Sequence, residues 1–167
     1  MKRILWQGRF LRAIDEDGWE YVERRTSPEV VVIVAVQDER VLLVEQDRRA
    51  AGGRVLELPA GLVGDEDADE DLATAAAREL EEETGWRAGA LEVLGSYFSS
   101  PGLTPERYTV VRATRLTRVA DGGGVGGEDI AVHRVRLSEL ADFVRRRRAE
   151  GVGVDVKLWL VLGPDAI

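Results

Sequence analysis

Three glutamates carry the clearest chemical signal in this sequence. Glu79, Glu82 and Glu83 are spaced i, i+3 and i+4, so in a helix they share one face. Like charges on one face destabilise a helix by roughly a few tenths of a kcal/mol per pair. A bound Mg²⁺ or Mn²⁺ would reverse that effect, because hard cations prefer carboxylate oxygens as ligands. Taken alone, the same residues also fit a solvated acidic face.

The surrounding segment predicts the helix that these glutamates need. Over residues 69–83, Leu72, Ala76 and Leu80 recur at helical spacing, and Gly85 follows as a stop signal. The segment therefore predicts a helix over residues 69–83 that carries all three glutamates.

The charge of the chain is concentrated in one place. The 167 residues carry a net charge of −8, but residues 57–83 alone hold eleven acidic side chains and one arginine, a net −10. The remainder carries about +2. This balance argues against extended nucleic-acid binding and against an anionic membrane partner, but a metal-loaded acidic face with a basic surround could receive a small anionic substrate.

Other catalytic chemistries are limited by composition. The chain has no cysteine, which excludes disulfides, zinc–thiolate sites and cysteine nucleophiles. It has one histidine, His133, so a Ser-His-Asp triad or a multi-histidine metal site is hard to build.

The residues around the glutamates form a longer ordered pattern, G-x5-E-x7-R-E-U-x-E-E-x-G-U, where U is bulky and apolar. Its fixed positions are occupied by Gly64, Glu70, Arg78, Glu79, Leu80, Glu82, Glu83, Gly85 and Trp86. This pattern resembles the signature of the Nudix hydrolases. The opening glycine of that signature usually belongs to a turn like Pro59-Ala60-Gly61, so Gly61 is the alternative to Gly64, with three residues inserted before Glu70.

The resemblance implies a role for each matched residue. The family hydrolyses a nucleoside diphosphate linked to another group, by attack of water on phosphorus with the help of divalent ions. Metal ligands would be the three helix glutamates and the backbone carbonyl of Ala60. Glu70 and Arg78 would form a structural ion pair, and Gly85 would let the chain turn away from the helix.

Two further segments resemble the ADP-ribose and nucleoside-diphosphate-sugar pyrophosphatase branch. Gln46-Asp47-Arg48 is similar to its Q-Y-R motif, with Asp47 in place of the aromatic residue, and residues 100–106 match the stretch that approaches the sugar-phosphate end. The expected substrate-binding residues are Arg48, Arg54, Ser100, Pro101, Gly102 and Glu106. A simple turn is the alternative explanation of Pro101 and Gly102.

A general base is expected on the glycine-rich loop of residues 121–130. The branch's acidic residue before the next strand matches Glu128 best and Asp129 second. A flexible loop would let this carboxylate reach the attacking water. A helix glutamate, Glu82 above all, is the remaining alternative for this catalytic role, and an ordinary hairpin loop is the non-catalytic one.

Hydrophobic patterning predicts the elements that must position these residues. Strands are expected over residues 4–6, 10–14, 19–22, 30–36, 41–46, 57–61, 91–98, 108–119 and 130–137. A second helix should begin at Ser138 as its N-cap and end near Gly151. Residues 154–162 are ambiguous. We expect an α/β (α+β) fold, a Nudix-type α/β/α sandwich with a mixed central sheet and N-terminal antiparallel strands.

These observations predict one Nudix domain over residues 1–167. Residues 1–28 are expected to be a strand extension involved in homodimerisation, as the resembling branch implies and as Trp6 and Trp19 on short strands suggest. No secretory signal or membrane-length apolar run is visible, which favours a cytoplasmic protein with no membrane partner.

The expected activity is hydrolysis of ADP-ribose or a related nucleoside-diphosphate sugar with Mg²⁺ or Mn²⁺. The alternatives are a Nudix hydrolase of another nucleoside diphosphate derivative, such as a dinucleoside polyphosphate or damaged nucleotide, and a non-catalytic ligand sensor. The intact glutamate set argues against the sensor, because binding alone does not need it.

Overall fold

The computed structural model describes residues 1–26, 29–64 and 69–163. Its strands are β1 (Lys2–Gln7), β2 (Leu11–Glu16), β3 (Trp19–Arg24), β4 (Val30–Gln37), β5 (Arg40–Arg48), β6 (Gly53–Glu57), β7 (Ala60–Leu62), β8 (Trp86–Arg87), β9 (Ala90–Phe98), β10 (Arg107–Thr114), β11 (Thr117–Arg118), β12 (Ala131–Arg136) and β13 (Gly153–Val154). Its helices are α1 (Leu72–Thr84), α2 (Leu140–Ala149) and α3 (Trp159–Leu162), with 3-10 turns η1 (Leu137–Glu139) and η2 (Val156–Leu158). None of the described helices is long and apolar enough to cross a membrane.

A mixed sheet of eight strands forms the centre of the molecule. Its main path runs β13-β6-β5-β4-β10-β9, with β12 beside β5 and β7 beside β4. β4 pairs in parallel with β10, whereas β5 pairs antiparallel with β6 and β12. The β-branched run predicted over residues 30–36 lies in β4, and its side chains are largely buried, as expected for a strand covered on both faces.

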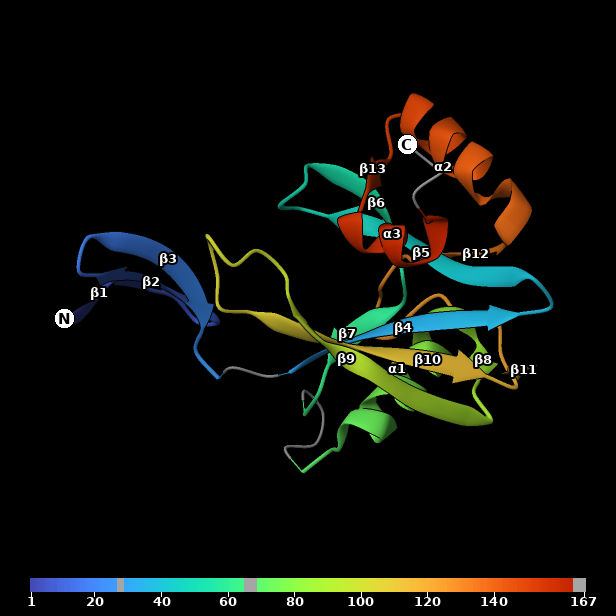
Figure 1. Ribbon diagram of the computed structural model, residues 1–167, viewed down its shortest axis with the longest axis horizontal. Coiled ribbons are helices and arrows are strands. Elements are labelled where there is room, and N and C mark those ends of the chain that lie inside the picture. Colours follow the sequence, from blue (N-terminus) through green and yellow to red (C-terminus); the bar gives the residue numbers. More distant parts are fainter. Residues whose placement is uncertain (27–28, 65–68, 164–167) are drawn as a thin grey trace.

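Helices cover both faces of this sheet (Figure 1). Val31 and Ile33 of β4 pack with Leu80 of α1 in one buried cluster. Val32, which points to the other face, packs with Leu140 of α2 and other apolar residues in a second cluster. Alternation along one strand therefore supplies both cores, and the predicted α/β/α sandwich is confirmed.

The first three strands form a separate antiparallel sheet in the order β1-β2-β3. This sheet stands away from the rest of the molecule in Figure 1. Ile14 is its fully buried apolar residue, while Trp6, Phe10 and Trp19 are 59, 66 and 65% exposed. The backbone N–H of Val22 donates to the carbonyl of Leu103, which ties the sheet to the loop after β9.

Four local predictions were inaccurate. The single strand expected over residues 57–61 is instead the end of β6 and the start of β7, separated by Leu58 and Pro59. Residues 108–119 are two strands instead of one, because Arg115 has a positive φ of 55° and the N–H of Gly89 donates to the carbonyls of Thr114 and Arg115. Ser138 does not cap a helix, since it lies inside η1 and α2 begins after Glu139 without a side-chain cap. Helix α1 begins at Leu72 instead of residue 69, because Asp71 accepts the N–H of Thr74 as the N-cap.

Candidate metal and catalytic site

The C-terminal end of α1 lies directly against the loop that was expected to carry the base. Gly85 ends the helix with φ +75°, and a Cβ there would stand 2.3 Å from the carbonyl oxygen of Ala120. A Cβ on Gly122 would meet the backbone of Thr84 at 2.4 Å. Because neither glycine has a Cβ, the two backbones can pass this close to each other. This close approach, as well as the turn at the helix end, requires glycine at position 85.

Backbone hydrogen bonds fix this crossing. The N–H groups of Gly123 and Gly124 donate to the carbonyls of Glu83 and Glu82 at 2.9 and 3.0 Å. The loop of residues 121–130 is therefore docked on the turn of helix that carries two of the expected metal ligands.

The start of β7, at Ala60 and Gly61, contacts the other side of these glutamates. A Cβ on Gly61 would lie 1.9 Å from the carboxyl carbon of Glu79, so that carboxylate packs on the bare glycine backbone. The N–H of Ala60 donates to Oε2 of Glu83 at 3.0 Å. The contact that the structure gives Ala60 is thus through its N–H, whereas the resemblance implied its carbonyl as a ligand.

Arg78 connects the acidic helix face to the preceding loop. Its guanidinium donates to both carboxylate oxygens of Glu70 at 2.8 and 3.1 Å and to the carbonyl of Leu62 at 3.3 Å. It also lies 3.0 Å from Glu79 and 3.1 Å from Glu82. Arg78 therefore holds the loop and partly neutralises two of the expected metal ligands.

Both candidate glycines contribute, though differently. Gly61 makes room for Glu79, while Gly64, with φ +77°, donates its N–H to Glu70 at 3.2 Å. Relative to the family signature, three extra residues were expected in the loop of residues 62–69. Residues 65–68 of that loop lie outside the described residues.

Burial changes the acidity of the helix glutamates. Glu83 is only 6% exposed, and burial raises its pKa to about 8 against the lowering effect of the Ala60 N–H, with the charge of Glu79 adding to the rise. Burial also raises the pKa of Glu79, opposed by Arg78 and reinforced by the charges of Glu82 and Glu128. Glu128 therefore lies within electrostatic reach of the helix face.

As the side chains stand, no three acidic or histidine groups among the described residues meet closely enough to hold one ion. The carboxylates of the helix glutamates are engaged by other groups: Glu79 and Glu82 pair with Arg78, and Glu83 accepts the Ala60 N–H. The donor set still fits a hard divalent cation, because it consists of carboxylates on one helix face, one of them buried at a cost that a cation would offset.

A cavity of about 260 Å³ opens beside this helix face. It is lined by Arg24, Val30, Arg48, Glu57, Leu58, Ala60, Gly61, Leu62, Glu106 and Lys157. Three cationic side chains converge there against two carboxylates. Because Ala60 and Gly61 line the cavity and also touch Glu83 and Glu79, an anion bound in it would adjoin the acidic face.

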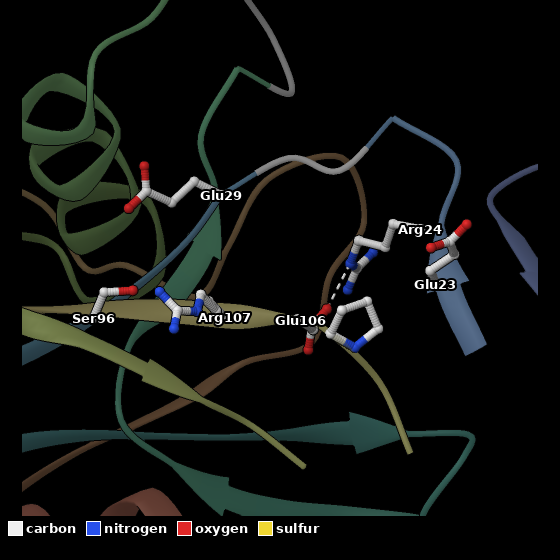
Figure 2. A pocket seen from close by; sticks show the side chains of 7 residues that line it. Glu23, Arg24, Glu29, Ser96, Glu106 and Arg107 are labelled. Atoms are coloured by element: carbon white, nitrogen blue, oxygen red, sulfur yellow. Dashed lines mark hydrogen bonds and ion pairs between the residues drawn. The ribbon is translucent and has the colours of Figure 1, made fainter. Parts of the chain in front are cut away.

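The cavity draws its charged groups from distant parts of the chain. Arg24 of β3 lies 2.6 Å from Glu106, and this ion pair also borders a neighbouring hollow of about 310 Å³ (Figure 2). Arg48 lies 2.6 Å from Glu57, which also accepts from Gln46.

The remaining expected substrate residues lie elsewhere. Pro101 lines a separate hollow with Trp19, Tyr21 and Phe98, and Ser100 accepts backbone N–H groups within its own loop. Gly102 has open space around it. Arg54 does not line the cavity, since its guanidinium binds Glu45 and Asp129.

Sequence reasoning missed Arg24, Glu57 and Lys157 as cavity residues. Lys157 had one available signal, since it is one of only two lysines among 23 basic residues. It is held by Asp155, which accepts its backbone N–H at 2.7 Å and pairs with its ammonium group. Arg24 carried no signal, because only the folded chain brings β3 to the loop after β9.

The Gly61 geometry makes a direct prediction. Gly61→Ala should lower kcat/KM by up to about 100-fold, because the new Cβ would displace the Glu79 carboxylate and an ångström-scale misplacement costs about that much. Steady-state kinetics and circular dichroism would test it. Gly53→Ala is the matched control, since nothing lies within 4 Å of a Cβ there. Full activity of Gly61→Ala would contradict the placement of Glu79 in the site.

The comparisons with known proteins agree with this geometry. A family model described as the NUDIX domain matches residues 26–160. The chain therefore belongs to the Nudix family and is a Nudix hydrolase. Members of this family act on nucleoside diphosphate-linked substrates and generally use divalent metal ions.

Its relatives include enzymes of the expected branch. The chain is 30% identical over 122 residues to an ADP-ribose pyrophosphatase of Bacillus subtilis, covering 72% of this chain and 64% of that protein's length. It is 33% identical over 176 residues to a CMP-5'-(N-acetyl-N-hydroxy-3-aminopropyl)phosphonate hydrolase of Streptomyces rubellomurinus, covering 97% and 80%. A solved structure described as an ADP compounds hydrolase shares the fold, with TM-score 0.64, 23% identity and coverage of 90% and 95%.

Proposed function

We propose that this protein hydrolyses ADP-ribose or a related nucleoside-diphosphate sugar to a nucleoside monophosphate and a sugar phosphate. The observation that carries the proposal is the cavity lined by three cationic side chains, which adjoins Glu79 and Glu83 through Ala60 and Gly61 of β7. The similarity to an ADP-ribose pyrophosphatase supports the same substrate class.

In this proposal Glu79, Glu82 and Glu83, with Ala60, hold Mg²⁺ or Mn²⁺. When bound, such an ion neutralises phosphate oxygens and makes water more acidic. Arg48, Arg24 and Lys157 receive the negative charge of the diphosphate. The oxygen of water attacks phosphorus, the anhydride P–O bond breaks, and Glu128 accepts the proton that the water loses.

A different nucleotide derivative is the second candidate substrate. The similarity to the CMP-phosphonate hydrolase extends over 97% of this chain and favours it. The decisive test is a substrate panel of ADP-ribose, GDP-mannose, UDP-glucose, a CMP-linked phosphonate, diadenosine polyphosphates and NADH, each with Mg²⁺ and with Mn²⁺. Turnover of the diphosphate sugars supports the first candidate, and turnover of none supports a ligand sensor.

We further propose a single Nudix domain over residues 1–167 that forms a homodimer through the extension at residues 1–28. The extension exposes Ile4, Trp6, Phe10 and Trp19 on a small sheet with little core of its own. A second copy covering these side chains would remove them from water.

The dimer makes a testable prediction. Solution scattering should give the mass of two chains, and Trp6→Glu should shift it toward the mass of one, because a buried charge would oppose association. Val125→Glu, another exposed apolar residue but far along the chain in the loop after β11, serves as the control. A monomeric mass for the wild type would contradict the proposal.

A further inference from the structure

A buried carboxylate on β5 joins three parts of the fold. Glu45 is 2% exposed and accepts hydrogen bonds from Arg147 of α2 at 2.7 to 2.9 Å and from Nε of Arg54 at 3.0 Å. Nε2 of His133 lies 3.3 Å away. Burial alone would raise the pKa of Glu45, but the bonds from Arg147 and Arg54 lower it, so the group is ionised and fixed. Burying an ionised carboxylate costs desolvation free energy, and its hydrogen bonds hold the side chains around it in place.

Arg54 is the partner of Glu45 that also contacts the loop of residues 121–130, which carries the proposed base. Its Nε and one terminal nitrogen bind Glu45, the latter through the backbone carbonyl at 2.6 Å. Its other terminal nitrogen donates to Oδ2 of Asp129 at 3.0 Å. The nitrogen that binds the Glu45 carbonyl also donates to the carbonyl of Asp129 at 3.5 Å. Because the guanidinium is planar and rigidly held by Glu45, it can keep Asp129, an otherwise exposed loop residue, in a fixed position relative to Glu45.

Asp129 closes the loop that carries Glu128. At its other end the loop is fastened to α1 by the N–H groups of Gly123 and Gly124. Between these two anchors, Gly126 and Gly127 have positive φ values of 63° and 94°, a backbone region that glycine adopts without strain. Glu128, next to the Arg54 anchor, turns its carboxylate back onto its own loop and accepts the N–H of Val125 at 3.0 Å.

We propose that Arg54 is a positioning residue for the reaction: by holding Asp129 against the buried Glu45, it fixes the point from which Glu128 swings toward the attacking water. The proposal rests on the proposed function, in which Glu128 is the base. It also gives Arg54 a role other than direct substrate contact, and it makes Asp129 an anchor instead of a second base, because its carboxylate is engaged by a guanidinium.

The experiment compares two exposed aspartates at the ends of the same loop. Asp129 is 91% exposed at its side chain, so Asp129→Asn replaces the ion pair with Arg54 by a weaker, neutral hydrogen bond without disturbing the core. Asp121, 98% exposed and 2.8 Å from Arg118, gives the matched control Asp121→Asn. We expect Asp129→Asn to lower kcat by up to about 100-fold with little change in KM, and Asp121→Asn to change neither.

A double-mutant cycle shows whether the loss of activity in Asp129→Asn depends on Glu128. If Arg54 acts through Glu128, Asp129→Asn should cost little further activity in the Glu128→Gln background, because the group that it positions is already disabled. The pH–rate profile of Asp129→Asn should keep the wild-type shape at a lower plateau, whereas loss of a base would change the shape. Asp129→Glu should recover part of the loss, and Arg54→Lys, which cannot bridge Glu45 and Asp129 as a fork does, should resemble Asp129→Asn.

Each outcome decides the proposal. Full activity of Asp129→Asn, or an undiminished loss in the Glu128→Gln background, overturns the positioning role while the hydrolase activity of the wild type stands. A changed pH profile for Asp129→Asn would make Asp129 itself the base and also overturns it. If the wild type hydrolyses no compound of the substrate panel, the proposed function fails and this inference falls with it.

Discussion

Glu83→Gln is expected to abolish nearly all activity while leaving the fold intact or more stable. The loss follows because the neutral amide is a poor ligand for a hard cation. Metal-ion stabilisation of the transition state is worth several kcal/mol, which corresponds to roughly a 1,000-fold lower kcat. Glu82→Gln should lose activity in the same way. Steady-state kinetics with saturating Mg²⁺ and Mn²⁺ measures the effect.

The same substitution is expected to lower activity but not the stability of the metal-free protein. The pKa of Glu83 is raised from its ordinary 4.5 to about 8, so in the metal-free protein its ionisation weakens the fold as pH rises from about 4.5 to 8. Glutamine stays neutral over that range and keeps a side-chain oxygen for the Ala60 N–H. We therefore expect the Tm of metal-free Glu83→Gln at pH 8 to equal or exceed that of the wild type.

Glu81→Gln provides the control on the same helix. Glu81 pairs with the exposed Arg87 on another side of α1, so its loss should leave kcat almost unchanged. Equal losses in Glu81→Gln and Glu83→Gln would show a general charge effect and contradict the metal-ligand role. A lower Tm for metal-free Glu83→Gln would contradict the cost of burying this carboxylate.

Glu128→Gln is the second variant for which a large effect is expected. Proton transfer to a positioned base contributes about 10²- to 10⁴-fold, so kcat should fall by that factor while KM changes little. Steady-state rates measured over a range of substrate concentrations at a fixed Mg²⁺ concentration would show both parameters.

An unchanged rate in Glu128→Gln would transfer the role of base to another group, with Glu82 of the helix as the first choice. Glu128 also accepts the N–H of Val125, so the variant could alter the loop. Glutamine keeps that acceptor oxygen, and hydrogen exchange of the loop amides should therefore match the wild type. A large rise in exchange would attribute the loss to loop disorder instead.

The helix and its spacing could be predicted because they depend on local physics. The 3.6-residue period places Glu79, Glu82 and Glu83 near one another whatever surrounds the helix. Glu83 is also three residues after Leu80 and seven after Ala76, so it shares the buried side of the helix with them. Most of the longer strands and the two longer helices followed from hydrophobic patterning in the same way, whereas β6, β8, β13 and α3 were not predicted. Predictions failed where one residue departs from a local preference, as at Arg115, whose positive φ is fixed by contacts with Gly89.

The sequence by itself thus determined the family, the acidic helix and the glycines that border it. Only the tertiary structure decided which charges meet. It buried Glu83 and thereby raised its pKa, brought Arg24, Arg48 and Lys157 to one cavity, and committed Arg54 to Glu45 and Asp129. Spacing along a chain fixes neighbours within a helix or strand, but the partner and the dielectric surroundings of a charge depend on residues far away in the sequence.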